Sequence, residues 1–235
     1  MMRSSPPPWS CLQQVVAADA PTRLTAHAPV VYFQKMSTAE KRLLSAEEYL
    51  ALESTADVRH EFHDGEMFAM GGGTLWHNLI KDNFAHSIRN RIEGRGCRVL
   101  TSDQRVKVDA TGLYTYPDVV VFCGAAIMED GIHHTLTNPL LIVEVLSEST
   151  EKYERGIKFG HYRRMATLRE YVLVAQDRLS VEVFLRQTGE TDPAGNGDHW
   201  MLSTAASPEA SIHLGTLGIT VPLAELYDGV EFPPG

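Results

Sequence analysis

Two apolar runs that each carry one acidic residue constrain the fold of this chain more than any other feature. Residues 116–123 read YPDVVVFC and residues 140–147 read LLIVEVLS. Runs this rich in Val, Ile and Leu predict strands buried on both faces of a sheet. Asp118 begins the first run and Glu144 lies near the end of the second, where an uncompensated carboxylate is costly. Two acids on adjacent strands suit a hard divalent cation. The alternative is two unrelated acids, each capped by backbone N–H groups or an Arg.

The length and composition predict one globular domain with a full core. The chain has 235 residues, of which 43% are hydrophobic. No apolar run approaches the roughly 20 residues that a membrane span needs. The cysteines at positions 11, 97 and 123 are widely spaced and form no C-x-x-C pair. Their spacing argues against a disulfide framework or a zinc site and favours a cytoplasmic location.

The charge distribution is uneven along the chain. The net charge is −9, but residues 81–107 hold seven Lys/Arg against three acids, and residues 152–169 hold six against one. Residues 177–235 hold two against nine. The two basic stretches flank the acid-bearing runs, so a local basic surface could bind phosphates despite the negative total. The alternative is ordinary solvated helix faces.

The domain organisation follows from proline content and periodicity. Residues 1–35 hold five prolines and no periodic pattern, which predicts a disordered N-terminal extension. Residues 36–232 are expected to form the domain, and residues 233–235 a short tail. No Gly-rich phosphate loop follows any expected strand, so the chain is not expected to be a doubly wound nucleotide-binding protein.

The first half of the domain carries several local signals. Ser45 and Glu48 form a capping box at the start of a short helix. Asp64-Gly65 predicts a hairpin turn, with Glu61 in the first hairpin strand. Thr74 caps a long helix to about residue 93, whose core stripe is expected at positions 76, 80, 84, 88 and 92. Strands are predicted at 98–100 and 105–108, and a polar loop at 124–138.

The sequence of the second half of the domain predicts a βαβ crossover followed by a β-meander. The Glu144 strand, a helix over 150–166 and a strand over 170–175 form one βαβ unit. The apolar side of this helix is expected at positions 153, 157, 162 and 165. Further strands are predicted at 180–185, 200–203 and 212–214, with a flexible hairpin tip at 189–197 and a helical turn at 221–226. The fold class is therefore mixed α/β, with a helix-flanked sheet.

The acids match a known arrangement for phosphodiester cleavage. Such cleavage needs an activated water and neutralised charge at phosphorus, which metals held by carboxylates supply. In that arrangement an Asp opens one strand and a Glu-x-Lys lies on the next, with Glu and Lys on one face. Pro117-Asp118 and Glu144-Val145-Leu146 fit this arrangement, except that Leu146 takes the place of the Lys.

The ordered motifs of the chain resemble the Uma2 (DUF820) family of the PD-(D/E)XK restriction-endonuclease-like superfamily. The resemblance runs from about residue 45 to residue 185. It rests on the following motifs: HEFHDGE at 60–66, His77, PDVVV at 117–121, VEVLSEST at 143–150, then Arg155, Lys158 and Tyr162, and REY at 169–171. It implies a single-domain α+β fold: a restriction-endonuclease-like mixed β-sheet flanked by helices.

The resemblance also implies a site. Glu61, Asp118 and Glu144 are the expected metal-binding acids, with Mg²⁺ or Mn²⁺ as cofactor and DNA as the partner. Many nucleases of this fold act as homodimers. Leu146 departs from the superfamily's Glu-x-Lys but agrees with this family's pattern. The missing Lys must then come from elsewhere, or the site is inactive.

Lys158 is our predicted replacement. It lies about two turns into the helix that follows the Glu144 strand, so its side chain can reach back towards the acids. Lys152 is the competing candidate, and a solvated Lys on a basic helix face is the alternative. His77 and Gln104 are further candidates for the active site, although His77 could instead be a packing or capping residue.

Three functions remain open, and each requires a different arrangement of the acids and basic residues in the fold. A divalent-metal-dependent endonuclease that hydrolyses phosphodiester bonds in DNA needs the acids and a Lys to converge within several Å. A catalytically inactive nucleic-acid-binding protein needs a basic groove without that convergence. An assembly protein with a nuclease-like fold needs neither. The distances among Glu61, Asp118 and Glu144 therefore discriminate best between these functions.

Overall fold

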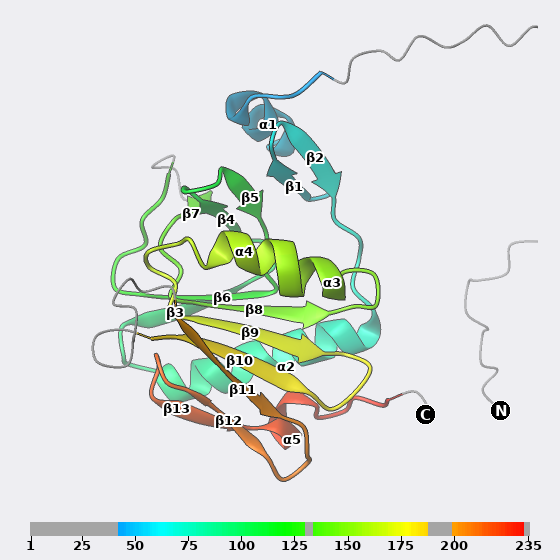
Figure 1. The fold of residues 1–235 in the computed structure, drawn as a ribbon, viewed down its shortest axis with the longest axis vertical. Coiled ribbons are helices and arrows are strands. Elements are labelled where there is room, and N and C mark those ends of the chain that lie inside the picture. Colours follow the sequence, from blue (N-terminus) through cyan, green and yellow to red (C-terminus); the bar gives the residue numbers. More distant parts are fainter. Residues whose placement is uncertain (1–41, 130–133, 188–198, 233–235) are drawn as a thin grey trace, which may run out of the picture. The chain divides into compact units, whose positions relative to one another are not determined.

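The computed structural model describes residues 42–129, 134–187 and 199–232 (Figure 1). The expected extension over 1–35, the hairpin tip over 189–197 and the tail over 233–235 lie outside these residues. A six-stranded sheet has the order β11-β10-β9-β8-β6-β3. Its strands are β3 (Cys97–Thr101), β6 (Val119–Cys123), β8 (Leu141–Leu146), β9 (Glu170–Ala175), β10 (Val181–Arg186) and β11 (Trp200–Ala205).

The two acid-bearing runs form neighbouring strands at the centre of this sheet. β6 pairs antiparallel with β8, with Val119 opposite Val143. β8 pairs parallel with β9, which confirms the predicted crossover. Every residue of β8 is buried, including Glu144. The sheet therefore brings both acids to one region of the core.

A second sheet of five strands has the order β2-β1-β5-β4-β7. The predicted hairpin is β1 (His60–His63) and β2 (Glu66–Ala69), and its turn places Asp64 and Gly65 at positive φ angles of 50° and 81°. β4 (Arg105–Val108) was also predicted. β5 (Leu113–Thr115) and β7 (Thr135–Leu136) were not, because strands of three and two residues carry no alternation pattern.

Helices cover both faces of the six-stranded sheet (Figure 1). α2 (Leu75–Ile92) begins after Thr74, whose hydroxyl accepts the His77 N–H at 3.1 Å. Its buried stripe packs against one face of β6, β8 and β9; the stripe consists of Ile80, Phe84, Ile88 and Ile92. Trp76 is only half-buried, so the predicted stripe is one residue shorter. α1 (Ala46–Glu53) has the predicted capping box.

The opposite face carries a helical segment with an unexpected centre. α3 (Glu151–Tyr153) continues into the π-helical turn η1 (Glu154–Lys158) and then α4 (Phe159–Tyr162). The expectation that Ile157 faces the core is wrong, since its side chain is 64% exposed while Glu154 and Lys158 are buried. The i→i+5 hydrogen bonding of a π-helix shifts side chains away from the 3.6-residue period on which the prediction rested.

The C-terminal segment adds a separate hairpin. β12 (Ser211–Leu214) pairs with β13 (Ile219–Pro222), and α5 (Leu223–Leu226) follows directly. The predicted helical turn over 221–226 therefore begins two residues late, because Val221 and Pro222 pair with β12. None of the described helices is both long and apolar enough to cross a bilayer.

The expectation that the cysteines form no disulfide is wrong. Cys97 and Cys123 form a disulfide. They are direct partners across the antiparallel β3–β6 pair, 26 residues apart in sequence. Cysteine spacing alone cannot reveal this pairing, because it depends on strand register. The argument from cysteine spacing for a cytoplasmic location therefore no longer applies.

Candidate active site

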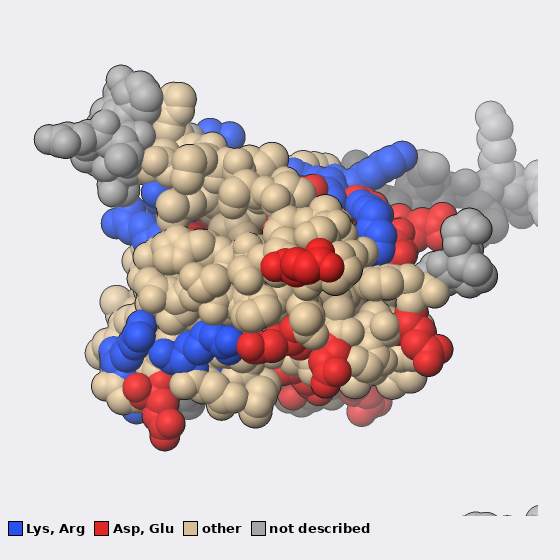
Figure 2. All heavy atoms as spheres, turned by 90° about the horizontal axis from the view of Figure 1, so that it is seen from below, with Lys and Arg blue, Asp and Glu red and all other residues tan. Residues whose placement is uncertain are grey.

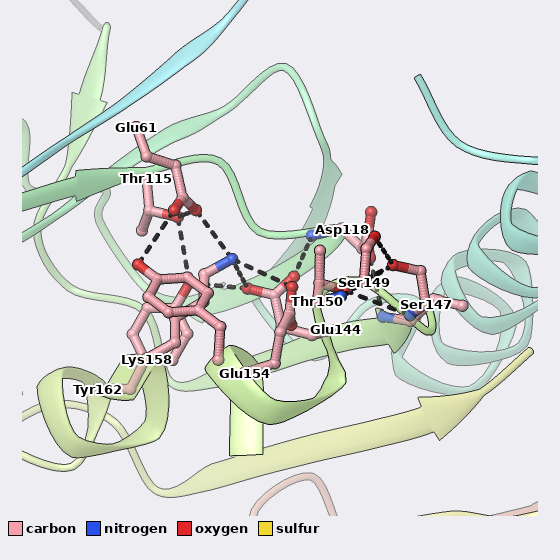
Figure 3. Close-up of polar contacts among 12 residues, drawn as sticks. Glu61, Thr115, Asp118, Glu144, Ser147, Ser149, Thr150, Glu154, Lys158 and Tyr162 are labelled. Atoms are coloured by element: carbon pink, nitrogen blue, oxygen red, sulfur yellow. Dashed lines mark hydrogen bonds and ion pairs between the residues drawn. The ribbon is translucent and has the colours of Figure 1, made fainter. Parts of the chain in front are cut away.

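A buried lysine joins acids from three elements (Figure 3). Lys158 Nζ lies 2.9 Å from Glu61 Oε1 on β1 and 2.9 Å from Glu144 Oε1 on β8. It lies 3.7 Å from Glu154 Oε1, one turn earlier in η1. The Lys158 side chain is only 4% exposed. The structure thus brings Glu61, Glu144 and Lys158 into direct contact.

Strand alternation explains why these side chains meet. In β8, Ile142, Glu144 and Leu146 share one face, and Ile142 and Leu146 pack in the same core cluster as Tyr162 of α4. β1 pairs with β5 through Phe62 and Tyr114, which turn towards α1. The intervening Glu61 must therefore point the other way, towards the helical segment.

Asp118 and Glu144 are linked directly to each other. The Asp118 backbone N–H donates to Glu144 Oε2 at 3.2 Å, and the Val145 N–H donates to Asp118 Oδ2 at 2.8 Å. His77 Nε2 lies 2.9 Å from Asp118 Oδ1. One oxygen of each acid thus accepts a backbone N–H, as expected for two unrelated capped acids. However, each N–H comes from the strand segment of the other acid, so the two acids are not unrelated.

Glu61 is held as an anion by its neighbours. Thr115 Oγ1 donates to its Oε1 at 2.5 Å, and the Tyr153 hydroxyl donates to its Oε2 at 3.2 Å. Burial raises the pKa of the Glu61 carboxyl, but the Lys158 ammonium and these hydroxyl donors outweigh burial. The net result is a pKa below the ordinary value.

The other two buried acids shift in the opposite direction. Burial raises the pKa of Glu144, and the neighbouring charge of Asp118 adds to the rise, against the opposing effect of Lys158. Burial likewise raises the pKa of Glu154 well above its ordinary value. Glu154 Oε2 is a buried oxygen without a hydrogen-bond partner among the described residues. The site therefore holds more buried negative charge than Lys158 alone compensates.

The hydroxyl of Tyr162 provides a test of how tightly this cluster is held. It donates to Glu144 Oε1 at 2.8 Å, and both groups are buried. We expect Tyr162→Phe to lower the free energy of unfolding by about 1.5–3 kcal/mol, because a hydrogen bond to a buried charge is lost. Urea denaturation measures this change. Tyr153→Phe, at a less buried donor, is the control with a smaller loss, and an unchanged Tyr162→Phe stability would contradict the expectation.

The remaining predicted residues lie in different places. His77 contacts Asp118 from the first turn of α2. Gln104 does not contact the acids; its amide donates to the carbonyl oxygens of Arg105 and His134, at 2.9 and 3.2 Å. Arg155, which the 3.6-residue period places beside Lys158, instead pairs with Glu151 and Glu182.

Several basic residues of the 81–107 stretch make structural contacts. Arg91 pairs with Glu225 at 2.7 Å, and Lys107 pairs with Glu129. Arg95 donates to the Leu217 carbonyl at 2.9 Å. Figure 2 views the molecule from below. On the described part of that face the basic side chains form several separate groups, with acidic side chains beside them. This face thus offers no continuous basic surface.

The oxygen donors of the site can be matched to a divalent cation only in part. Among the described residues, no group of three or more His, Cys, Asp or Glu side chains is arranged to hold a metal ion. Asp118 and Glu144 nevertheless provide adjacent oxygen donors, and the charge of Asp118 contributes to the raised pKa of Glu144. Lys158 lies between Glu144 and Glu61. The Asp118–Glu144 pair therefore fits a hard cation better than the full trio does.

Sequence reasoning missed several members of this cluster. Thr115 lies in a strand too short to predict, so its contact with Glu61 could not be expected. Glu154 was not among the predicted site residues. A signal for it did exist, since Glu154 and Lys158 are four residues apart in a stretch with one acid.

Comparison with known proteins assigns the chain to a family. Residues 46–215 match the model of the Uma2 family, which is described as "Putative restriction endonuclease". The chain belongs to the Uma2 family. The match covers both sheets and the helical segment with Lys158, so the predicted resemblance is confirmed and nuclease-type chemistry is the general function class.

Similar proteins support this assignment. The protein slr1290 of Synechocystis sp. (strain ATCC 27184 / PCC 6803 / Kazusa) is 32% identical over 209 residues, which are 89% of this chain and 100% of that protein. The protein sll1609 of the same strain is 31% identical over 184 residues, 78% of this chain and 99% of that one. The solved structure of "a putative nuclease belonging to DUF820" from Anabaena variabilis ATCC 29413 superposes with a TM-score of 0.62. At 17% identity it covers 79% of this chain and 98% of that one, which confirms the fold class of this Uma2 chain.

Proposed function

We propose that this Uma2 protein is a divalent-metal-dependent endonuclease that hydrolyses phosphodiester bonds in DNA. The observation that carries the proposal is the convergence of Lys158 Nζ on Glu61 and Glu144, at 2.9 Å from each, beside Asp118. A buried lysine among acids is the feature that an inactive binding protein or an assembly protein does not need. The family description supports the same chemistry.

Each side chain has a role that follows from its contacts. Asp118 and Glu144 would hold Mg²⁺ or Mn²⁺, which when bound activates water and neutralises charge at phosphorus. His77 and the Val145 N–H fix the Asp118 carboxylate, while Tyr162 fixes Glu144. Lys158 would orient the attacking water or neutralise charge in the transition state.

Glu61 has the role of positioning the lysine. Its lowered pKa keeps it ionised, so it holds the Lys158 ammonium from the side opposite Glu144. Thr115 and Tyr153 in turn fix both Glu61 oxygens. The lysine is thus preorganised by two carboxylates before any substrate binds.

Cleavage of plasmid DNA tests the proposed activity. We expect the wild-type protein to nick or linearise supercoiled DNA with Mn²⁺ or Mg²⁺, and EDTA to stop the reaction. Absence of cleavage with either metal, together with retained DNA binding in a filter or anisotropy assay, would favour the catalytically inactive nucleic-acid-binding alternative. A homodimer would supply one site for each strand of a duplex, and sedimentation measures that state.

Asp118→Asn tests the metal ligands independently of cleavage. We expect millimolar Mn²⁺ to raise the melting temperature of the wild-type protein, because a cation bound only by the folded state stabilises it and relieves the repulsion of Asp118 and Glu144. Asp118→Asn should lose this gain. Glu148→Gln, at an exposed carboxylate four residues after Glu144, is the matched control and should keep it. Calorimetry without detectable metal binding to the wild type would contradict the prediction.

A further inference from the structure

A polar pocket lies on the other side of the five-stranded sheet from Glu61. Its volume is about 530 Å³, and it is formed by α1, the residues before β1, the residues around the start of β4, and the residue after β5. The polar side chains that line it include Glu53, Ser54, Arg59, Gln104, Arg105 and Tyr116. Residues of β1 and β5 alternate between the two faces, so this pocket is separate from the acid–lysine cluster.

Arg105 is the central feature of this pocket. The residue is 8% exposed. Its Nε donates to Thr135 Oγ1 at 2.8 Å and its Nη1 donates to the Tyr116 hydroxyl at 3.3 Å, and both acceptors are neutral. No described carboxylate lies within the 4.0 Å of an ion pair. A guanidinium has five N–H donors, so three are unused by the described residues. A nearly buried cation without a carboxylate partner is costly.

Glu53, the buried acid that lines this pocket, does not supply the missing anion. Glu53 Oε1 accepts from the His60 N–H at 3.0 Å and from the Tyr116 hydroxyl at 2.8 Å, and its Oε2 lies 2.9 Å from His60 Nδ1. Both oxygens are therefore occupied. Arg105 reaches Glu53 only through the Tyr116 hydroxyl. The remaining donors of Arg105 are left for a group inside the pocket.

A second guanidinium, that of Arg59, also lines the pocket. The Arg59 guanidinium carbon lies 5.6 Å from the centre of the Tyr116 ring. Arg59 Nε is 3.8 Å from an Asp103 oxygen, but both side chains are well exposed, so this pair contributes little. Tyr116 therefore contacts two guanidiniums, Arg105 at its hydroxyl and Arg59 at its ring.

We propose that this pocket binds a phosphate group between Arg59 and Arg105. A guanidinium offers paired donors that match phosphate oxygens, and a partly buried one binds them more strongly than an exposed one. Two sources share this chemistry: a backbone phosphate of a nucleic acid and the free inorganic phosphate ion. Because the site does not include Glu61, Asp118, Glu144 or Lys158, the proposal stands or falls separately from the nuclease function.

Calorimetric titration with inorganic phosphate at constant ionic strength tests the site. We expect saturable binding to the wild-type protein and binding weaker by at least about tenfold in Arg59→Gln and in Arg105→Met, since each loses hydrogen bonds to a charged group. Arg98→Gln, an exposed arginine on β3, is the matched control and should bind like the wild type. Arg59 is exposed, so its variant tests the proposal even if Arg105→Met fails to fold.

Absence of saturable binding to the wild-type protein would overturn the proposal, as would unchanged binding in Arg59→Gln. A second titration distinguishes the sources of the phosphate. Anisotropy of a labelled DNA oligonucleotide is measured in EDTA over a series of salt concentrations. If the phosphate belongs to the nucleic acid, Arg59→Gln weakens oligonucleotide binding and lowers the salt slope by about 1. If only the affinity for inorganic phosphate falls, the ligand is free phosphate.

Discussion

Lys158→Met is expected to destabilise this protein by about 3–5 kcal/mol at neutral pH. Removing one partner of a buried ion pair leaves an uncompensated charge in the core. Here the loss leaves Glu61, Glu144 and Glu154 without their common cation. Chemical denaturation followed by circular dichroism measures the effect. Lys152→Met removes an exposed lysine from the same helical segment and should change stability by less than about 0.5 kcal/mol.

The pH dependence of this loss gives a second check. In the folded wild type the pKa of both Glu144 and Glu154 is raised above its ordinary value of 4.5, first of all by burial. A carboxyl with a raised folded pKa stabilises the folded state below its unfolded pKa, and this contribution is lost as pH rises through the folded pKa. Lys158→Met raises these values further. Its destabilisation should therefore shrink as the pH falls towards 4.5, and a loss that is constant with pH would contradict the charge explanation.

Cleavage by the same variant is the second large expected effect. We expect Lys158→Met to reduce Mn²⁺-dependent DNA cleavage by at least about 10²-fold, the scale seen when one preorganised charge-stabilising group is removed. The assay must be run below the unfolding transition of the variant, with folding checked by circular dichroism. Its DNA affinity should remain within a few-fold of the wild type.

Two controls separate catalysis from stability. Lys152→Met should cleave like the wild type, because Lys152 is exposed and makes no contact with the acids among the described residues. Ile88→Ala tests whether lost stability alone reduces cleavage, since it removes buried contacts of α2 on the face of the sheet opposite Glu144. If folded Lys158→Met cleaves DNA as fast as the wild type, Lys158 has no part in the mechanism.

The local sequence determined most of the regular elements of this protein. The apolar runs around Asp118 and Glu144 predicted neighbouring buried strands, because continuous Val, Ile and Leu indicate burial on both faces. The cap at Thr74 and the turn at Asp64-Gly65 were equally readable, since each depends on the chemistry of a few adjacent residues. The order of the motifs was sufficient to indicate the Uma2 family.

Only the tertiary structure decided which distant side chains share one space. The π-helical turn buries Glu154 and Lys158 and exposes Ile157, and no local signal marked where the helix would depart from the 3.6-residue period. The Cys97–Cys123 disulfide depends on the register of β3 and β6. The position of Gln104 away from the acids depends on how the two sheets are oriented relative to each other. Local sequence fixes backbone conformation over a few residues, whereas contacts between elements follow from packing and register over the whole chain.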